Sequence, residues 1–596
     1  MCGISLLIDN SPQAEYKIHQ MMAANRHRGP DHTECSQVSE KVWIAGNRLK
    51  ILDLSDASNQ PFWDESKRYV LVWNGALYNY QDLRNKLLDI GYTFKTNSDS
   101  EVFLLWLKEH GVSGIKSLKG MFSFVFVNLD LEEIIIARDP SGEKPLYYHQ
   151  KDDQWVFSSE ARGVKAGLDQ RPNIDGAQFL PYFYSRHTFP DRSFYQGIQQ
   201  FLPGRGLKLD LQGKCLVEFT WEHEVAKKEA FSQQLFESKL KDAVLKNFHS
   251  ERNVGVILSG GADSSLLYQL WLEETGQPMP TFTATFEKAF QKKYRDPIYA
   301  RKLTSNYEGF HHEVHISLDK IKANWDEYIE SLDQPVGDSA SLLTWIIGKE
   351  AKSDVQVLIS GAGADELLGG YQRHSAFKFY LNNKTLLLKL KPYIQWLPLP
   401  RRVRKFLASI KADPKHTFLN FASLRPVPEE TAQQFLNWYP SVTDVYSAAL
   451  DFDRKYYLVN DILKVHDNAC MAHGIEGRTP YMDFDLIAWI KSFSEAEHLK
   501  ICGKQPIKSA LIYRGMDKIA KRKKLGFGLP LEEWFARDKA FQNWINPEIK
   551  AMYYKWGRHF PMEMQALCKA PEKASKDQFL LIWNMFILAS WLRIHA

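Results

Sequence analysis

Cys2 is the first residue of this chain that could do covalent chemistry. It follows the initiator Met1 and precedes a small residue, Gly3. Removal of Met1 would leave a cysteine whose own amine, with an unperturbed pKa of about 7.7–8.0, could act as the base for its thiol. Most cysteines are simply small buried hydrophobes, so a second-position cysteine indicates little by itself.

A catalytic interpretation of Cys2 is supported by four short motifs that follow it. These are RHRGPD (26–31), NRL (47–49), WNGALYN (73–79) and NSDSE (97–101), with ARDPSGEKPLYY (137–148) and FSSEAR (157–162) further along. The set resembles the class II glutamine amidotransferase domain, which has an N-terminal-nucleophile hydrolase fold. The resemblance extends over essentially all of residues 1–210.

Hydrolysis of the glutamine amide needs a thiolate, an oxyanion hole and a grip on the free amino acid. By the resemblance, Cys2 attacks, Asn74 and the backbone N–H of Gly75 form the oxyanion hole, and Arg48 holds the substrate carboxylate. Asn74 and Asp99 complete the expected glutamine site, with Asp99 taking the α-ammonium. The structural alternatives are a turn at Asn74 and Gly75 and ordinary surface ions at Arg48 and Asp99.

One position departs from this family. Where its members usually carry a glutamate that helps to receive the α-ammonium, this chain has Ala76. We expect a reduced affinity for glutamine.

A glycine-lined loop, SGGADSS (259–265), follows an apolar strand and opens a helix. Backbone N–H groups and the helix dipole at such a position suit phosphate, but the loop lacks the GK[ST] of a Walker sequence. It resembles the pyrophosphate loop of ATP pyrophosphatases, and a structural glycine turn is the alternative. The expected ATP-binding residues are Leu258, Ser259, Gly260, Gly261, Asp263, Ser264, Ser265, Ser360 and Gly361.

A second strand ends in SGAGADELLGGY (360–371). Its Asp365 and Glu366 should lie at the same sheet edge as Asp263, and Asp263 and Asp365 are the expected ligands of Mg²⁺, which prefers oxygen ligands near phosphates. Three segments resemble asparagine synthetase motifs: SGAGADELLGGY (360–371), MAHGIEGRTPYMD (471–483) and KKLGFGLPLEEW (523–534). By that resemblance Lys504 stabilises charge during adenylate formation, with Lys508 as the other candidate.

Together these motifs resemble the glutamine-hydrolysing asparagine synthetase family across nearly the full chain. The resemblance implies that ATP and a carboxylate, aspartate in the type enzyme, form an acyl-adenylate and pyrophosphate, and that ammonia from glutamine then displaces AMP. A homodimer is common in the family, but the sequence does not specify one.

Two other functions stay open. Family members usually carry Asp or Glu where this chain has Ala362, which favours an amidotransferase acting on another carboxylate, such as a sugar acid or a biosynthetic intermediate. A non-catalytic nucleotide-binding homologue is the second alternative, and the presence of Cys2, Asn74, Asp263 and Asp365 argues against it.

Two domains should position these residues, because 596 residues exceed what one core usually spans. Short strands separated by turns predict an α+β domain over 1–215, and the resemblance implies that it has the αββα layers of N-terminal-nucleophile hydrolases. Strands alternating with helices predict a doubly wound parallel α/β sheet over 216–596, with ligands at the carboxyl ends of its strands. The change of pattern falls within 210–228.

Composition and charge limit the classes of partner and the cellular compartment that we expect for this protein. The chain is 44% hydrophobic and 25% charged, and its net charge of +5 is too small to favour nucleic acid as a partner. Six scattered cysteines predict no disulfide framework, and the start of the chain does not resemble a signal peptide, so we expect a cytoplasmic enzyme.

Three further segments have competing interpretations. The apolar run 579–592 is too short to span a membrane and predicts a buried terminal helix. The basic stretch 384–415 is either a surface-binding amphipathic helix or a solvated insert, and Pro392, Pro398 and Pro400 favour the insert. HHEVH (311–315) lacks zinc-protease spacing, and the basic run 521–524 is expected to edge the nucleotide cleft.

Overall fold

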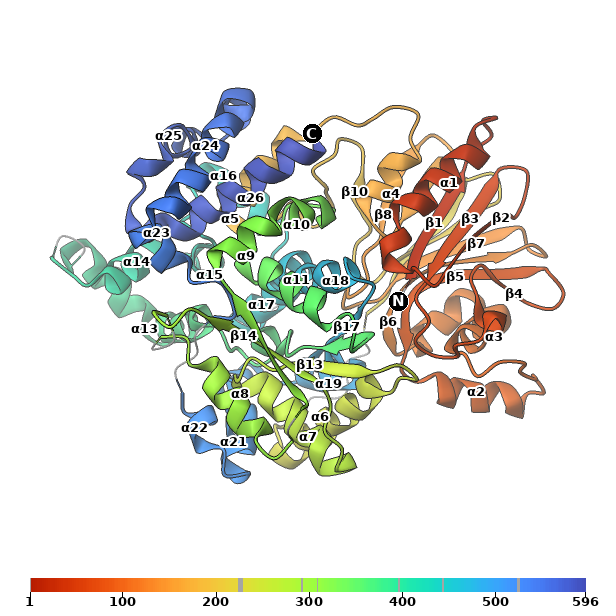
Figure 1. Ribbon diagram of the computed structural model, residues 1–596, viewed down its shortest axis with the longest axis horizontal. Helices are drawn as coiled ribbons and strands as arrows, with labels where there is room; N and C mark the ends of the chain where they lie inside the picture. The colour runs from red at the N-terminus through yellow and green to blue at the C-terminus, as the bar shows by residue number, and fades with distance from the viewer. Residues whose placement is uncertain are drawn as a thin grey trace.

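The computed structural model describes residues 2–222, 229–290, 293–307, 309–394, 397–441, 444–522 and 526–596. The first domain is a sandwich of two antiparallel sheets with helices on both outer faces, as the sequence predicts (Figure 1). One sheet has the order β10 (Gln199–Gln200), β8 (Tyr147–Lys151), β9 (Gln154–Ser158), β1 (Cys2–Ile8), β3 (Val42–Arg48), β2 (His32–Gln37). The other has the order β12 (Cys215–Thr220), β11 (Arg205–Asp210), β7 (Glu133–Arg138), β6 (Gly120–Asn128), β5 (Tyr69–Leu77), β4 (Phe62–Trp63).

Alternating apolar residues hold the two sheets together. Ile4 and Leu6 of β1 meet Val70 and Val72 of β5 in the layer between the sheets. Residues at every second position of a strand share one face, so the same strands leave their other faces for helices. The outer helices are α1 (Ala14–Ala24) and α4 (Ala161–Ala166) on the first sheet, and α2 (Tyr80–Asp89) and α3 (Asp99–His110) on the second.

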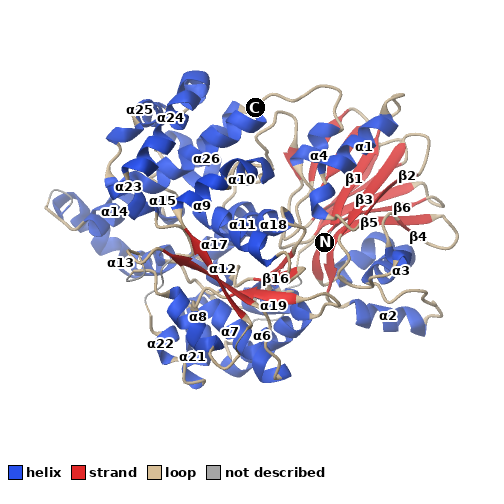
Figure 2. Ribbon diagram, in the orientation of Figure 1, coloured by secondary structure: helices blue, strands red, loops and turns tan. Residues whose placement is uncertain are grey.

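The second domain is built on a five-stranded parallel sheet, which confirms the predicted fold class (Figure 2). All of its neighbouring strands pair in parallel. The order is β15 (His311–Ile316), β14 (Thr281–Phe286), β13 (Val254–Ile257), β16 (Val357–Ile359), β17 (Glu476–Arg478).

Helices cover both faces of this sheet, as buried parallel strands require. Val256 and Ile359 pack in the core with α6 (Gln233–Phe248), α7 (Ala262–Thr275), α19 (Phe484–Lys491) and α21 (Gln505–Tyr513). Ile257 and Leu358, one residue away on each strand, point to the opposite core with α11 (Ser339–Ala351) and α18 (Leu463–Met471). The remaining helices around the sheet are α8 (Asp296–Thr304), α9 (Leu318–Ala323), α10 (Trp325–Ser331), α12 (Ala364–Leu367), α20 (Glu495–Ile501) and α22 (Asp517–Ala520).

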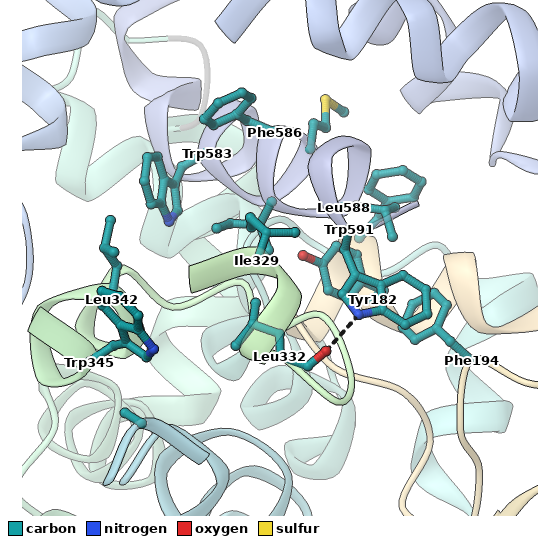
Figure 3. Close-up of a cluster of buried hydrophobic side chains, with 14 of the residues drawn as sticks. Tyr182, Phe194, Ile329, Leu332, Leu342, Trp345, Trp583, Phe586, Leu588 and Trp591 are labelled. Carbon is teal, nitrogen blue, oxygen red and sulfur yellow. Dashed lines mark hydrogen bonds between the residues drawn. The ribbon is translucent and has the colours of Figure 1, made fainter. Parts of the chain in front are cut away.

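The apolar run near the C-terminus forms α26 (Phe579–His595), which is buried in the protein core (Figure 3). Its Trp583 and Trp591 pack against α10 and α11, and the indole nitrogen of Trp591 donates to the carbonyl of Leu332 at 3.1 Å. None of the described helices is long and apolar enough to cross a membrane. The prediction of a buried terminal helix is confirmed.

α26 also packs on α5 (Phe179–Ser185) of the first domain, whose Tyr182 hydroxyl donates to the carbonyl of Asn584 at 3.0 Å. Around it lie α23 (Leu531–Arg537), α24 (Lys539–Trp556) and α25 (Met562–Lys569). The domains therefore share an apolar core, so they should act as one body.

Helix α13 (Gln372–Ile394) is kinked at Asn383 and ends two residues after Pro392, in line with the expectation that the prolines limit helix length here. One sequence expectation needs correction. The strand β12 (Cys215–Thr220) pairs with β11, so a boundary at 215/216 would cut a strand of the first domain. We propose a boundary beyond Thr220. The rest of this helical region is α14 (Arg401–Ser409), α15 (Pro414–Ala422), α16 (Glu429–Leu436) and α17 (Val445–Phe452).

Candidate functional site

Cys2 is brought to its expected partners by the pairing of strands. In the register of β1 and β3 it lies opposite Arg48, and its backbone nitrogen donates to the side-chain oxygen of Asn74 on β5 at 3.0 Å. Cys2 is buried, and burial raises the pKa of its thiol while the charge of Arg48 opposes that rise. A base near the sulfur is therefore needed to form a thiolate.

Asn74 has the geometry of an oxyanion-hole donor. Its side-chain oxygen is used by Cys2, whereas its amide nitrogen is buried and has no hydrogen-bond partner in the described part of the chain. A buried donor without a partner is costly unless a ligand satisfies it. A Cβ at the adjoining Gly75 would stand 1.9 Å from the carbonyl oxygen of Met121, so only glycine fits there.

Arg48 points into the same cavity as Cys2, but its guanidinium is already engaged. It donates to the carbonyl of Ser55 at 2.8 Å and to the side chain of Asn59 at 2.9 Å, and also to the carbonyls of Leu52 and Asp53. These contacts fix its orientation. A substrate carboxylate would have to share these donors or displace carbonyls.

Asp99 begins α3, where Ser98 caps the helix by accepting from the backbone N–H of Ser100. Its carboxylate accepts from the N–H of Leu77 at 3.2 Å and lines the cavity. Burial raises the pKa of Asp99 to about 6, and the nearby negative charge of Glu476 adds to that rise. Asp99 is therefore ionised at neutral pH and protonates in mild acid.

Sequence reasoning missed three residues that line this cavity. The side-chain amide of Gln60 lies 3.5 Å from the sulfur of Cys2 and is held by the backbone N–H of Trp73. Glu476 and Arg478 of β17 also line the cavity, although they belong to the second domain. The motif 471–483 contains both residues, but nothing in the sequence places it beside Cys2.

The glycine loop of the second domain connects β13 to α7 as expected. Leu258 directly follows the strand, and the hydroxyl of Ser264 accepts from the backbone N–H of Ser259 at 3.2 Å. The helix begins after Gly261 with no capping side chain from the described residues, so N–H groups in its first turn remain for a phosphate. Ser265 and Gly260 are buried, while Gly261 is half-buried.

The loop 360–371 lies directly beside it. The N–H of Ser360 donates to the carbonyl of Arg478 at 3.0 Å, and a Cβ on Gly361 would stand 2.9 Å from the Cβ of Asp263. The N–H of Ala362 donates to the hydroxyl of Ser360 at 3.4 Å. The two loops thus meet at the carboxyl edge of β13 and β16, where parallel sheets bind ligands.

Lys504 joins the two acidic residues of these loops. Its ammonium lies 2.6 Å from a carboxylate oxygen of Asp263 and 2.7 Å from one of Asp365. Burial would lower the pKa of Lys504, but the two carboxylates raise it above its ordinary value. Gly370 makes room for this contact, since a Cβ there would stand 2.1 Å from Lys504 Cε. The described residues form no ion pair with Lys508.

Asp263 and Asp365 fit a hard cation. Their carboxylates already converge on one positive group, and Oδ1 of Asp263 is buried without a hydrogen-bond partner in the described ranges. Carboxylate oxygens are the ligands Mg²⁺ prefers, with substrate phosphates and waters completing its shell. No cluster of three or more His, Cys, Asp or Glu suited to a metal occurs among the residues that the structure describes.

A neighbouring cavity lies over the ends of β13 and β14 and is lined by Ser259, Phe286, Leu343 and Phe527. Arg522, from the predicted basic run, donates to the carbonyl of Gly260 at 2.9 Å, so this residue does edge the loop. Lys523 and Lys524 lie outside the described residues. His311 to His315 form β15 at the edge of the sheet.

Buried ion pairs also join the two domains. Arg28 donates to Glu160 and to Asp467 of the second domain, both at 2.9 Å. Lys144 lies 3.4 Å from Asp467 and donates to the carbonyl of Gly477 at 3.2 Å. Paired buried charges of this kind tie the interface to one arrangement, and loss of one partner would strand the other.

Comparison with known proteins matches both domains. Residues 1–220 match the model of the glutamine amidotransferase domain, and residues 235–593 match the model of the asparagine synthase family. Asparagine synthetase [glutamine-hydrolyzing] 1 of Bacillus subtilis (strain 168) is 27% identical, covering 100% of this chain and 97% of the relative. A putative asparagine synthetase [glutamine-hydrolyzing] of Mycobacterium bovis is 26% identical over 95% of this chain and 92% of its own length.

Among solved structures, the chain is similar to glutamine phosphoribosylpyrophosphate (PRPP) amidotransferase from B. subtilis complexed with ADP and GMP. The identity is 14%, the match covers 61% of this chain and 82% of that one, and the TM-score is 0.29. A score this low carries no argument about the site.

Proposed function

Because this chain belongs to the asparagine synthase family and joins that domain to a glutamine amidotransferase domain, we propose that it is a glutamine-dependent ligase that consumes ATP and amidates aspartate to asparagine. One observation carries the proposal: strand β17 connects two reactive centres. Its Glu476 lines the cavity of Cys2, and the carbonyl of its Arg478 receives the N–H of Ser360 in the second loop.

In the first half-reaction, the thiolate of Cys2 attacks the side-chain amide of glutamine. The amine of Cys2, once Met1 is removed, takes the thiol proton and returns it to the departing nitrogen. The Asn74 amide and the Gly75 N–H stabilise the oxyanion, and water then hydrolyses the γ-glutamyl thioester to release glutamate. The unpaired amide nitrogen of Asn74 supports this role.

In the second half-reaction, an oxygen of the acceptor carboxylate attacks the α-phosphate of ATP, and pyrophosphate leaves. The loop 258–265, with Ser360 and Gly361, would cradle the phosphates, and Asp263 and Asp365 would hold Mg²⁺, which neutralises phosphate charge when bound. Lys504 would move from the two carboxylates toward the negative charge that develops on the α-phosphate. Ammonia then attacks the acyl carbon, displaces AMP and loses a proton.

Ammonia has to pass between the centres unprotonated, because ammonium is no nucleophile. The buried pairs of Arg28 with Glu160 and Asp467 close the interface between the domains, which favours transfer inside the protein. A cytoplasmic location and a homodimer belong to the same proposal. The described cysteines are all free, as a reducing compartment requires.

A second candidate is an amidotransferase that acts on another carboxylate, and Ala362 is the observation that favours it. A methyl group at this position can neither accept a proton from ammonia nor bind the ammonium of aspartate. A screen of carboxylic acids for glutamine-dependent pyrophosphate release tests both candidates. Aspartate as the best acceptor supports asparagine synthesis, another acid supports the second candidate, and no release with any acid would contradict an amidotransferase.

A further inference from the structure

The glutamine cavity has an unusual source of negative charge. Position 76 lines the cavity but carries only a methyl group, so it cannot receive the α-ammonium of a bound amino acid. Among the described residues of the first domain, Asp99 is then the one carboxylate that lines this cavity. A single carboxylate at the N-terminus of a helix leaves some N–H donors of the ammonium without a charged partner.

The second domain contributes another carboxylate to the same cavity. Glu476 begins β17, and its side chain is 1% exposed. Its carboxylate accepts from Arg478 Nε at 2.6 Å, while Arg478 Nη1 donates to the carbonyls of Asn247 and His249 at 2.8 and 2.7 Å. The backbone N–H of Glu476 donates to the carbonyl of Gln356 at 2.8 Å. Glu476 is therefore held rigidly by its own domain.

Glu476 and Asp99 are close enough to influence each other. The negative charge of Glu476 is one of the causes that raise the pKa of Asp99, after burial. Burial would raise the pKa of Glu476 too, but neighbouring positive charges, among them Arg478 and Lys144, lower it below its ordinary value. Two carboxylates that face one cavity repel each other, and a cation between them relieves that repulsion.

Arg48 brings the complementary charge to the same cavity. Arg48 lies beside Cys2, so an amino acid whose side chain reaches Cys2 can turn its carboxylate to Arg48 and its ammonium to the two acids. We propose that Glu476, together with Asp99, receives the α-ammonium of glutamine in place of a carboxylate at residue 76. The inference rests on the proposed glutaminase activity. It means that the second domain completes the glutamine site.

The decisive experiment compares two ligands that differ only in the ammonium group. Binding of glutamine and of 4-carbamoylbutanoate, which lacks the α-amine, is measured by calorimetry on full-length Cys2→Ala protein. Adding Glu476→Gln should weaken glutamine binding about 10- to 100-fold, the range for a lost hydrogen bond to a charged group. Binding of the amine-free ligand should change less than about twofold, because a site built for a polar group discriminates only between ligands that differ in it.

Two further variants separate recognition from structural damage. Ala76→Glu, added to Glu476→Gln, should restore most of the glutamine affinity by supplying the carboxylate from the first domain. Asp485→Asn is the matched control. It removes an ion pair between the domains outside the cavity, Lys119 with Asp485 at 2.6 Å, and should leave both affinities unchanged. Should Glu476→Gln not fold, Glu476→Asp, which keeps the charge, should give an intermediate loss for glutamine alone.

Equal weakening of both ligands, or unchanged glutamine binding in Glu476→Gln, would overturn the inference. The proposed function fails in a different way, namely if unmodified protein neither hydrolyses nor binds glutamine.

Discussion

The cavity around Cys2 and the cluster around Lys504 differ in how their polar groups are used. In the first, strands of two sheets hold a donor, the amide of Asn74, that has no partner within the described ranges. In the second, the ammonium of Lys504 already neutralises Asp263 and Asp365. The first site is preorganised for a developing negative charge, whereas in the second Lys504 would have to leave the two carboxylates before they could bind Mg²⁺.

The difference suggests that the two chemistries can be separated by mutation even though the domains share a core. Cys2→Ala should reduce glutamine-dependent synthesis to background and leave synthesis from ammonium salts, because only the first site uses the thiol. Amide product is measured with each nitrogen source. Equal loss of both activities in folded protein would contradict the separation.

Asp263→Ala or Asp365→Ala should have the reverse effect. Pyrophosphate release should fall about 10³-fold or more with any nitrogen source, because the triphosphate would lose its metal and Lys504 would lose a partner. Glutamine hydrolysis, measured as glutamate release, serves as the internal control and should persist. Near-normal pyrophosphate release would refute the assigned metal role.

Lys504 and Lys508 form a matched pair of substitutions. Lys504→Ala should lower pyrophosphate release by about 10²–10³-fold, the loss typical of one donor to transition-state charge. Lys508→Ala should change it less than about threefold, since Lys508 forms no ion pair with the described residues. If Lys504→Ala and Lys508→Ala lowered pyrophosphate release equally, the ammonium of Lys504 would have no special role in this step.

Ala362→Glu tests how far the second site follows the family. If aspartate is the acceptor, a carboxylate there should raise amidation by about 10²-fold, the lower end of what a general base supplies. If the pocket is shaped for another acid, the same change should lower turnover of that acid. Rapid aspartate turnover that is the same with and without Ala362→Glu would show that this position does not affect amidation.

The smallest effect should appear in the pH dependence of glutamine binding. Burial raises the pKa of Asp99 to about 6, so the carboxylate is neutralised as the pH falls through that value and loses its attraction for an ammonium. Below about pH 6 the Kd for glutamine, measured on Cys2→Ala protein, should rise up to about tenfold per pH unit. Asp99→Asn should flatten this dependence. A Kd that stays constant from pH 7 to pH 5 in protein that retains Asp99 would contradict the role of Asp99.

Much of this arrangement was predictable because several motifs contain neighbouring parts of one site. Asn74 and Gly75 adjoin on one strand, and residues 258–265 pass directly from strand to helix, so local sequence determines their relative geometry. The parallel sheet and the buried terminal helix followed from hydrophobic patterns. The prolines limit helix length as the sequence predicts, because α13 ends two residues after Pro392.

The sequence by itself determined which residue types are expected to carry the proposed chemistry: the nucleophile, the oxyanion donors, the phosphate loop and the paired acids. Only the tertiary structure decided which distant groups meet them. Lys504 reaches Asp263 across 241 positions, and Glu476 enters the cavity of Cys2 from the other domain. The reason is physical: such contacts depend on how strands and domains pack, and a single lysine or glutamate in a sequence does not reveal what it will face once buried.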